Sequence, residues 1–255
     1  IFDDELLVGR PNTWLGRYGL VYGELDGSLF KAAIDACARQ QGQKGSIVIT
    51  EADQRAIEDL LYPYWSGKDF GTSFVRALPE ATRFYFFGPD RGNVAMATGV
   101  GICSAVWRHS QNWAHDFAKI LNKGCAGIRA EAEARLTAID EPFDVVEKKP
   151  FLEAIVITCD ALTTWARRYA ALATEMAARE SNPQRKRELE EIAAACAHVP
   201  EHPARTFREA LQAQWFAQMF SRLEQNIGGQ VSQGRMDQYL YPFYRKDVEE
   251  GRLTK

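Results

Sequence analysis

The longest helical repeat in the chain lies between residues 151 and 179. Apolar side chains recur there every three or four residues, at Leu152, Ile155, Val156, Cys159, Leu162, Ala166, Tyr169, Ala173 and Met176. This spacing places them along one side of an α-helix, since a helix completes a turn in about 3.6 residues. The sequence therefore predicts one long helix over residues 151–179.

Two further helices are predicted from the residues at their starts. Asn182 precedes Pro183, which is the arrangement of an N-cap followed by a proline at the first helical position. Residues 206–209 read Thr-Phe-Arg-Glu and match a capping box, in which the Thr and Glu side chains each accept a backbone N–H. The helix that follows is expected to run to about residue 223, with four side chains facing inward: Phe207, Leu211, Trp215 and Met219.

Earlier in the chain, helices are expected at residues 29–40 and 50–62. Thr50 has the position of an N-cap, and Pro63 is expected to end the second of them. Residues 225–232 are the best strand candidate, because two glycines there stand among β-branched residues. No repeat or flexible linker interrupts residues 1–255, so the sequence predicts a predominantly α chain without an internal domain boundary.

Composition limits the classes of function. The 255 residues are 46% hydrophobic and carry a formal charge of −3, without the basic run that nucleic-acid binding requires. No apolar run approaches the roughly 20 residues of a membrane span, and the acidic start does not resemble a signal peptide. Neither nucleic acid nor a membrane is expected as a partner, and the expected location is cytoplasmic.

The five cysteines do not have the spacing of a metal site. They are Cys37, Cys103, Cys125, Cys159 and Cys196. None forms a CxxC pair or has a histidine at zinc-ligand spacing, so no metal is expected. Cys125 follows Gly124 at a predicted helix break, and a packing role is expected for its thiol. Arg235 and Asp237 are expected to form a structural ion pair.

Residues 107–117, WRHSQNWAHDF, collect unusual polar groups. If this segment is helical, Arg108, Gln111, Asn112, His115 and Asp116 share one side, opposite an apolar stripe. An ordinary solvated surface has the same pattern. Amide, imidazole and guanidinium groups also orient small polar ligands, whereas solvated surfaces are usually rich in Lys and Glu. His115 and Asp116 are adjacent, so they point in different directions and are not expected to form a dyad.

Four segments resemble the glycyl radical enzymes of the pyruvate formate-lyase superfamily. They are YPYWSGK at residues 62–68, DFAKILNKG with GIRAEAE at 116–133, VPEHPARTFREALQ at 199–212 and GRMDQYLYPF at 234–243. Each is weakly specific alone, but their order and rough spacing are similar to those of the N-terminal third or so of the family, from the start to the end of this chain. The resemblance implies the N-terminal helical part of a ten-stranded α/β barrel enzyme.

The resemblance implies that a partner activase, which uses S-adenosylmethionine, installs a radical on a glycine of the enzyme. The radical moves to a cysteine, which removes hydrogen from the substrate. The Gly-Cys-x-Glu loop and the Arg-Val-x-Gly loop that carry these residues are absent here, so no catalytic residue is expected within this chain and no bound cofactor. A homodimer is also implied, and location in a bacterial microcompartment is left open.

Two departures from the family pattern bear on the substrate. The resemblance places Arg108 where choline-type lyases have a tyrosine. It places Asn112 where many diol dehydratases have a histidine. An arginine at this place resembles the sulfonate-cleaving branch, since a guanidinium grips a sulfonate by parallel charged hydrogen bonds. Gln111, Asn112 and Asp116 are then candidates to bind the rest of the substrate, with Asp116 accepting from its hydroxyl.

The sequence thus favours a carbon–sulfur lyase acting on a short hydroxyalkylsulfonate such as isethionate or dihydroxypropanesulfonate, with sulfite and a carbonyl compound as products. Two alternatives stay open. One is a diol or hydroxysulfonate dehydratase, which breaks a carbon–oxygen bond. The other is a helical binding module without catalytic function.

Overall fold

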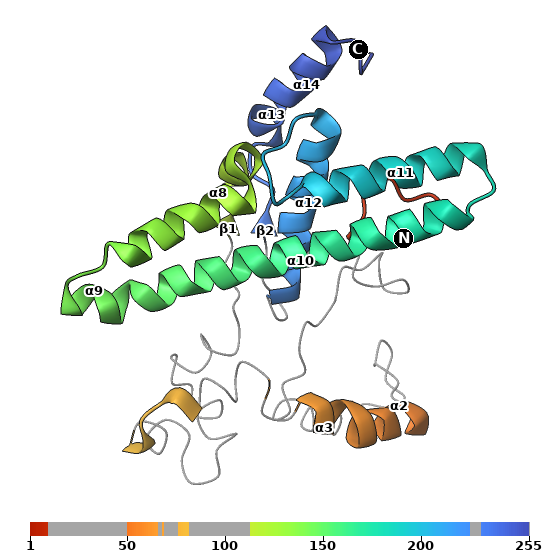
Figure 1. Ribbon diagram of the computed structural model, residues 1–255. Coiled ribbons are helices and arrows are strands. Elements are labelled where there is room, and N and C mark those ends of the chain that lie inside the picture. Colours follow the sequence, from red (N-terminus) through yellow and green to blue (C-terminus); the bar gives the residue numbers. More distant parts are fainter. Residues whose placement is uncertain (10–49, 66–67, 69–75, 82–112, 225–230, 255) are drawn as a thin grey trace. The chain divides into compact units, whose positions relative to one another are not determined.

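A computed structural model describes residues 1–9, 50–65, 68, 76–81, 113–224 and 231–254 (Figure 1). The chain divides into two compact units, each described here by itself. One comprises residues 1–19, 112–222 and 231–255, and the other comprises residues 20–111 and 223–230. The described residues are mostly helical, which confirms the predicted class. That residues 1–255 lack a domain boundary stays a prediction.

The smaller unit contains a continuous helical run with a change of pitch. It comprises α2 (Glu51–Ala56), the π-helical turn η1 (Ile57–Leu61) and α3 (Tyr62–Trp65). Thr50 caps α2 as predicted: its Oγ1 accepts from Asp53 N at 3.1 Å, and Asp53 Oδ2 accepts from Thr50 N at 2.9 Å. The prediction that Pro63 ends the helix is wrong. Pro63 lies in the first turn of α3, where a missing N–H is tolerated.

Long helices dominate the larger unit. They are α8 (Phe117–Thr137), α9 (Pro142–Glu147), α10 (Lys149–Arg179), α11 (Pro183–His198), α12 (Phe207–Glu224), α13 (Met236–Tyr239) and α14 (Tyr241–Glu249). The long helix predicted at residues 151–179 is confirmed as α10, which packs against α8 and α11 (Figure 1). No helix in the described part of the chain is long and apolar enough to cross a bilayer.

The main core lies where α10 meets α11 and α12. Cys159, Leu162, Ala166 and Ala173 of α10 pack there with Leu189, Ile192 and Cys196 of α11 and with Phe216 of α12. Trp165 and Tyr169 add their rings to Phe216, with ring centroids 5.3 and 5.7 Å from it. The apolar stripe read from the sequence is therefore the side of α10 that holds the unit together.

The start of α11 agrees with its prediction, and the start of α12 agrees in part. Asn182 Oδ1 accepts from the N–H groups of Gln184 and Arg185. At α12, Thr206 Oγ1 accepts from Glu209 N at 3.2 Å, which is half of the predicted capping box. The Glu209 carboxylate instead accepts from Arg205 N at 2.8 Å. The other half fails because Arg205 also places its guanidinium against Glu209, at 2.5 Å.

Burial along α12 differs from the predicted stripe. Phe207, Leu211, Trp215 and Met219 are only partly buried. The fully buried apolar side chains are Ala210, Ala213 and Phe216. The prediction was wrong about which side is most buried because α12 contacts two clusters: Phe216 joins the main core, and Ala210 and Ala213 join a second cluster with Leu121, Val199 and Leu240.

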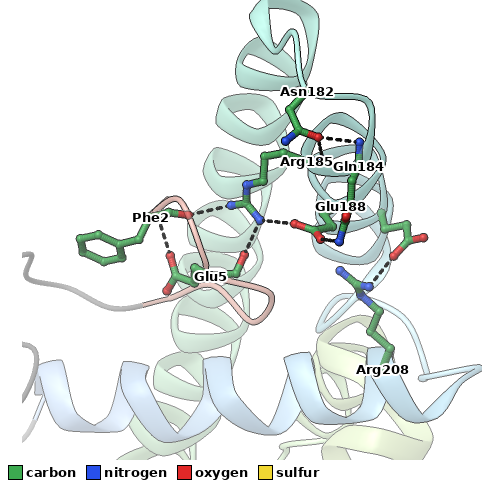
Figure 2. A network of polar contacts seen from close by, with 8 residues as sticks. Phe2, Glu5, Asn182, Gln184, Arg185, Glu188 and Arg208 are labelled. Carbon is green, nitrogen blue, oxygen red and sulfur yellow. Dashed lines mark hydrogen bonds and ion pairs between the residues drawn. The ribbon is translucent and has the colours of Figure 1, made fainter.

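A buried arginine holds the first residues of the chain against α11 (Figure 2). Arg185 donates from Nη2 to the carbonyl of Phe2 at 2.7 Å and from Nη1 to the carbonyl of Glu5 at 3.0 Å. The same Nη1 lies 2.9 Å from Glu188 Oε2. Since a guanidinium has five N–H donors, it satisfies two backbone carbonyls and a carboxylate together. The N-terminal segment is thus fixed by side-chain contacts rather than by a strand.

Candidate functional site

Two short strands meet in parallel in the larger unit. They are β1 (Trp113–Ala114) and β2 (Val231–Ser232), with Trp113 opposite Val231 and Ala114 opposite Ser232. The helical interpretation of residues 107–117 is therefore wrong for residues 113–116, because pairing with β2 outweighs the local helical period, and Phe117 begins α8. The predicted strand at 225–232 is confirmed at its last two residues, and the rest of that range lies outside the described residues.

Polar residues follow both strands at the same edge of this pair. His115 and Asp116 follow β1, and Gln233, Gly234 and Arg235 follow β2. Because the strands are parallel, their carboxyl ends lie side by side, which is where α/β proteins commonly place ligand sites. We call these residues, with Ser221 and Tyr239, the strand-end site.

Asp116 is the N-cap of α8. Its Oδ1 accepts from Lys119 N at 3.0 Å, and the side chain is otherwise exposed. A side-chain oxygen at the N-cap satisfies a backbone N–H of the first helical turn, so the carboxyl group of Asp116 is held at the start of α8. The role that the sequence gave it, accepting a hydrogen bond from a substrate hydroxyl, is compatible with this placement and stays a prediction.

His115 is half-buried and hydrogen-bonded to α12. Its Nε2 lies 2.6 Å from Ser221 Oγ, and Ser221 Oγ donates to the Ala217 carbonyl at 2.8 Å. Burial lowers the pKa of His115, so the neutral ring is favoured. That His115 and Asp116 do not form an acid–base dyad stays a prediction.

Aromatic contacts join the two strand ends. The ring of Phe117 lies 5.5 Å from that of His115 and 5.4 Å from that of Tyr239. Tyr239 donates its hydroxyl to the Gln233 carbonyl at 2.8 Å, directly after β2. Phe117 is only 1% exposed, so this chain of contacts is anchored in the interior.

The side of α12 that ends at Ser221 is polar and buried. Gln214, Gln218 and Ser221 stand at positions i, i+4 and i+7, so they share one side of the helix. Gln214 is 3% exposed and Gln218 9% exposed. The Gln214 Nε2 atom has no hydrogen-bond partner. Buried amides cost stability unless they are paired, so this side of α12 is not explained by stability alone.

Arg235 and Asp237 form the predicted ion pair. Arg235 Nε and Nη2 donate to the two carboxylate oxygens at 3.0 and 2.8 Å. Both side chains are about two-thirds exposed, at 70% and 64%. Water screens such a pair, so it orients the loop after β2 and contributes little to stability.

The other predicted substrate residues, Arg108, Gln111 and Asn112, lie outside the described residues. Within the described part, no three His, Cys, Asp or Glu side chains are grouped to hold a metal ion. Sequence reasoning missed the pair of His115 and Ser221, which are 106 residues apart. No local spacing signals such a pair; it becomes visible only once β1 is placed beside α12.

The surface also has a pocket of about 560 Å³ near the start of α11. It is lined by Asp3, Asp4, Leu6, Met176, Glu180, Asn182, Gln184, Arg185 and Glu188. None of these residues belongs to the strand-end site. Arg185, which fixes the N-terminal segment in Figure 2, lies in the wall of this pocket.

Comparison with known proteins decides the family. The model of the pyruvate formate lyase-like family matches residues 1–255. The chain belongs to the pyruvate formate lyase-like family. Isethionate sulfite-lyase from Oleidesulfovibrio alaskensis is 48% identical over 257 residues, and the match covers 100% of this chain and 30% of that protein. The enzyme of the same name from Nitratidesulfovibrio vulgaris is 46% identical with the same coverage.

A solved structure supports the same family. A glycyl radical enzyme from Archaeoglobus fulgidus matches with a TM-score of 0.71 and 27% identity, over 100% of this chain and 31% of that one. The resemblance read from four segments is thereby confirmed. The pyruvate formate lyase-like chain described here spans about a third of the length of its relatives.

Proposed function

We propose that this chain is the N-terminal part of a glycyl radical carbon–sulfur lyase that cleaves a short hydroxyalkylsulfonate. The observation that carries the proposal is the identity of 48% to an isethionate sulfite-lyase along the whole chain. Arg108 adds a chemical reason, because a sulfonate stays anionic at physiological pH and a guanidinium binds it through paired charged hydrogen bonds. Choline, a cation, would be repelled by the same arginine.

The reaction begins with removal of hydrogen from the carbon that bears the hydroxyl. The resulting substrate radical loses its hydroxyl proton, and the carbon–sulfur bond then breaks so that both bonding electrons leave with sulfite. The remaining carbonyl radical takes back one hydrogen atom. Isethionate thereby gives acetaldehyde and sulfite, with all atoms balanced. The radical itself is supplied by a cysteine and a glycine that this chain does not carry.

Residues of this chain would bind and orient the substrate. In the proposal, Arg108 binds the sulfonate, Gln111 and Asn112 supply amide donors and acceptors, and Asp116 accepts a hydrogen bond from the hydroxyl. That last bond assists loss of the hydroxyl proton, since a carboxylate acceptor stabilises the developing positive charge. Asp116 is the N-cap of α8, and its carboxylate accepts from Lys119 N, so the helix start fixes where the side chain lies.

A hydroxysulfonate dehydratase is the second candidate. Arg108 would serve it equally well, because dihydroxypropanesulfonate keeps its sulfonate when it loses water. The products separate the two reactions: the lyase releases sulfite, and the dehydratase does not. Asn112 in place of the histidine of many diol dehydratases favours the lyase.

The whole enzyme would fold as a ten-stranded α/β barrel surrounded by helices and act as a homodimer. It would require a radical S-adenosylmethionine activase, with no other bound cofactor. We also propose a cytoplasmic location, free or within a bacterial microcompartment. The barrel, the homodimer, the activase and the microcompartment follow from the family and not from the residues described here.

The test is anaerobic activation of the full-length enzyme. Incubation with a matching activase, S-adenosylmethionine and a reductant should give a glycine-type signal in electron paramagnetic resonance, and isethionate should then yield equal amounts of sulfite and acetaldehyde. A catalytically empty module would give neither. Turnover in air without an activase would contradict the proposal, and a sulfonated aldehyde from dihydroxypropanesulfonate without sulfite would favour the dehydratase.

A further inference from the structure

His115 is the single residue between the end of β1 and the cap of α8. Ala114 precedes it in the strand, and Asp116 follows it as the N-cap. The direction in which the Asp116 carboxylate points therefore depends on the backbone at His115. A contact that fixes the His115 side chain also restricts the backbone torsions that orient its neighbour.

The His115 ring is fixed from two directions. Its Nε2 is hydrogen-bonded to Ser221 Oγ at 2.6 Å, and its ring meets that of Phe117 edge-on, at an interplanar angle of 84°. Ser221 is itself held, because its hydroxyl donates to the Ala217 carbonyl one helical turn back at 2.8 Å. Rotation of the imidazole would break a hydrogen bond within a partly buried site, which is costly.

Stability alone would not call for polar groups at this place. An apolar ring at position 115 packed on an alanine at position 221 would fill the same space without any desolvation of polar atoms. The polar side of α12 continues inward from Ser221 to Gln218 and Gln214, both at least nine-tenths buried. A buried polar pair instead fixes one orientation, because hydrogen bonds are directional and apolar packing is not.

We propose that His115 is a positioning residue, held by Ser221, that orients the Asp116 carboxylate toward the substrate hydroxyl. The inference rests on the proposed function, since it needs a substrate for Asp116 to meet. His115 does not touch the substrate; it acts through Asp116. Its contribution is to orient a neighbouring group, since burial lowers the pKa of His115 and disfavours the charged ring.

A double-mutant cycle in the activated full-length enzyme tests the proposal. His115→Leu should lower kcat/KM for isethionate about fivefold, the effect of misplacing one hydrogen bond. In an Asp116→Asn background the same change should have almost no further effect, because the group through which His115 acts is already impaired. A merely structural role predicts independent losses, in which His115→Leu lowers kcat/KM by the same factor in both backgrounds.

Conservative variants separate positioning from folding. His115→Gln can place an amide N–H near the position of Nε2 and should recover most of the activity that His115→Leu loses. Ser221→Ala should reproduce the loss, and Ser221→Thr, which keeps the hydroxyl, should not. Equal loss in the Gln and Leu variants would overturn the inference. Normal turnover in all variants would overturn the positioning role of His115 and leave the proposed function in place. A wild-type enzyme that does not cleave isethionate would instead contradict the proposed function.

Discussion

The side-chain amide of Gln212 makes two hydrogen bonds with the backbone of Val8, 204 residues away. Gln212 Oε1 accepts from Val8 N at 3.0 Å, and Nε2 donates to Val8 O at 2.7 Å. Gln212 is 1% exposed and Val8 is fully buried. The amide thus replaces the neighbouring strand that an isolated buried backbone segment would otherwise need.

Gln212→Ala should therefore destabilise the protein strongly. The change leaves a buried N–H and a buried carbonyl of Val8 unpaired, which costs about 2 to 5 kcal/mol in the free energy of unfolding. Urea unfolding measures the total, and amide hydrogen exchange at residues 1–9 should rise locally. Gln184→Ala is the control, because that amide is exposed and its loss should stay within about 0.5 kcal/mol. Equal effects at both positions would contradict the assignment.

Gly124 allows α8 to approach the turn after α11. Its φ of 65° and ψ of 171° interrupt the helix. The next two amides, of Cys125 and Ala126, donate to the carbonyls of Pro200 and Glu201 at 2.7 and 2.9 Å. A methyl group at position 124 would overlap the Glu201 carbonyl and lie 2.7 Å from the carbonyl carbon of His202.

Gly124→Ala should therefore lower the free energy of unfolding by more than backbone strain alone would. Gly251 is the matched control, since its φ is 73° and a Cβ there meets nothing within 4 Å. We expect about 1 kcal/mol for Gly251→Ala and about 3 kcal/mol or more for Gly124→Ala, measured as the free energy of unfolding in urea. Similar values for the two variants would show that the turn moves aside easily.

Cys125 and Cys159 are predicted to be packing residues, and their surroundings agree. They are 3% and 7% exposed in the main core. A hydrogen bond with the Cys159 thiol and burial both raise the pKa of Cys125 far above its usual range. Iodoacetamide at pH 8 should leave Cys125 unmodified in the native protein, as judged by mass spectrometry. Cys125→Ala should lower stability yet preserve turnover in the full enzyme; loss of turnover with an intact fold would reveal a functional thiol.

Glu209 should make the stability of α12 sensitive to acid. Burial raises the pKa of Glu209, but hydrogen bonds from the Arg205 side chain and backbone outweigh burial, so the net pKa is lowered. A carboxyl whose folded pKa is depressed stabilises the protein above its unfolded pKa, and that contribution is lost as pH falls through the folded pKa. Glu209→Gln should flatten the acid side of the stability curve, followed by urea unfolding from pH 7 downward. An unchanged slope would assign the acid sensitivity to other carboxyls.

The sequence was most informative where local physics decides the structure. The stripe of α10 and the caps at Thr50 and Asn182 depend on residues within a few positions of one another, so spacing was sufficient to predict them. The break at Gly124 was visible for the same reason. The order and content of four segments also identified the family correctly.

Prediction failed where distant residues decide. Trp113 and Ala114 have a helical pattern, but pairing with β2, more than 100 residues later, makes them a strand. Asp247 in α14 accepts from Phe207 N at 2.8 Å and so completes the start of α12, a contact that no capping motif contains. The hydrogen bond between His115 and Ser221 also joins residues that are far apart in the sequence. The role of Arg108 was inferred from the chemistry of its side chain and stays a prediction, since Arg108 lies outside the described residues.

Arg108 is the sharpest test of the substrate. If Arg108 binds a sulfonate, Arg108→Lys keeps the charge and loses the paired hydrogen bonds, whereas Arg108→Ala loses both. Affinity for isethionate should fall in that order. Truncating a charged hydrogen-bonded group that is shielded from water costs on the order of 2 to 5 kcal/mol, so the Ala variant should bind well over tenfold more weakly.

The control for Arg108 is a substrate without the anion. Propanediol has no sulfonate to lose, so neither variant should change its kinetics noticeably, and the ratio of the two substrates isolates the contribution of the guanidinium from any effect on folding. A solvent-exposed arginine would instead contribute within about 0.5 kcal/mol and leave sulfonate turnover as it was. Kinetics of isethionate and dihydroxypropanesulfonate beside propanediol therefore decide between a sulfonate site and an ordinary polar surface at residues 107–117.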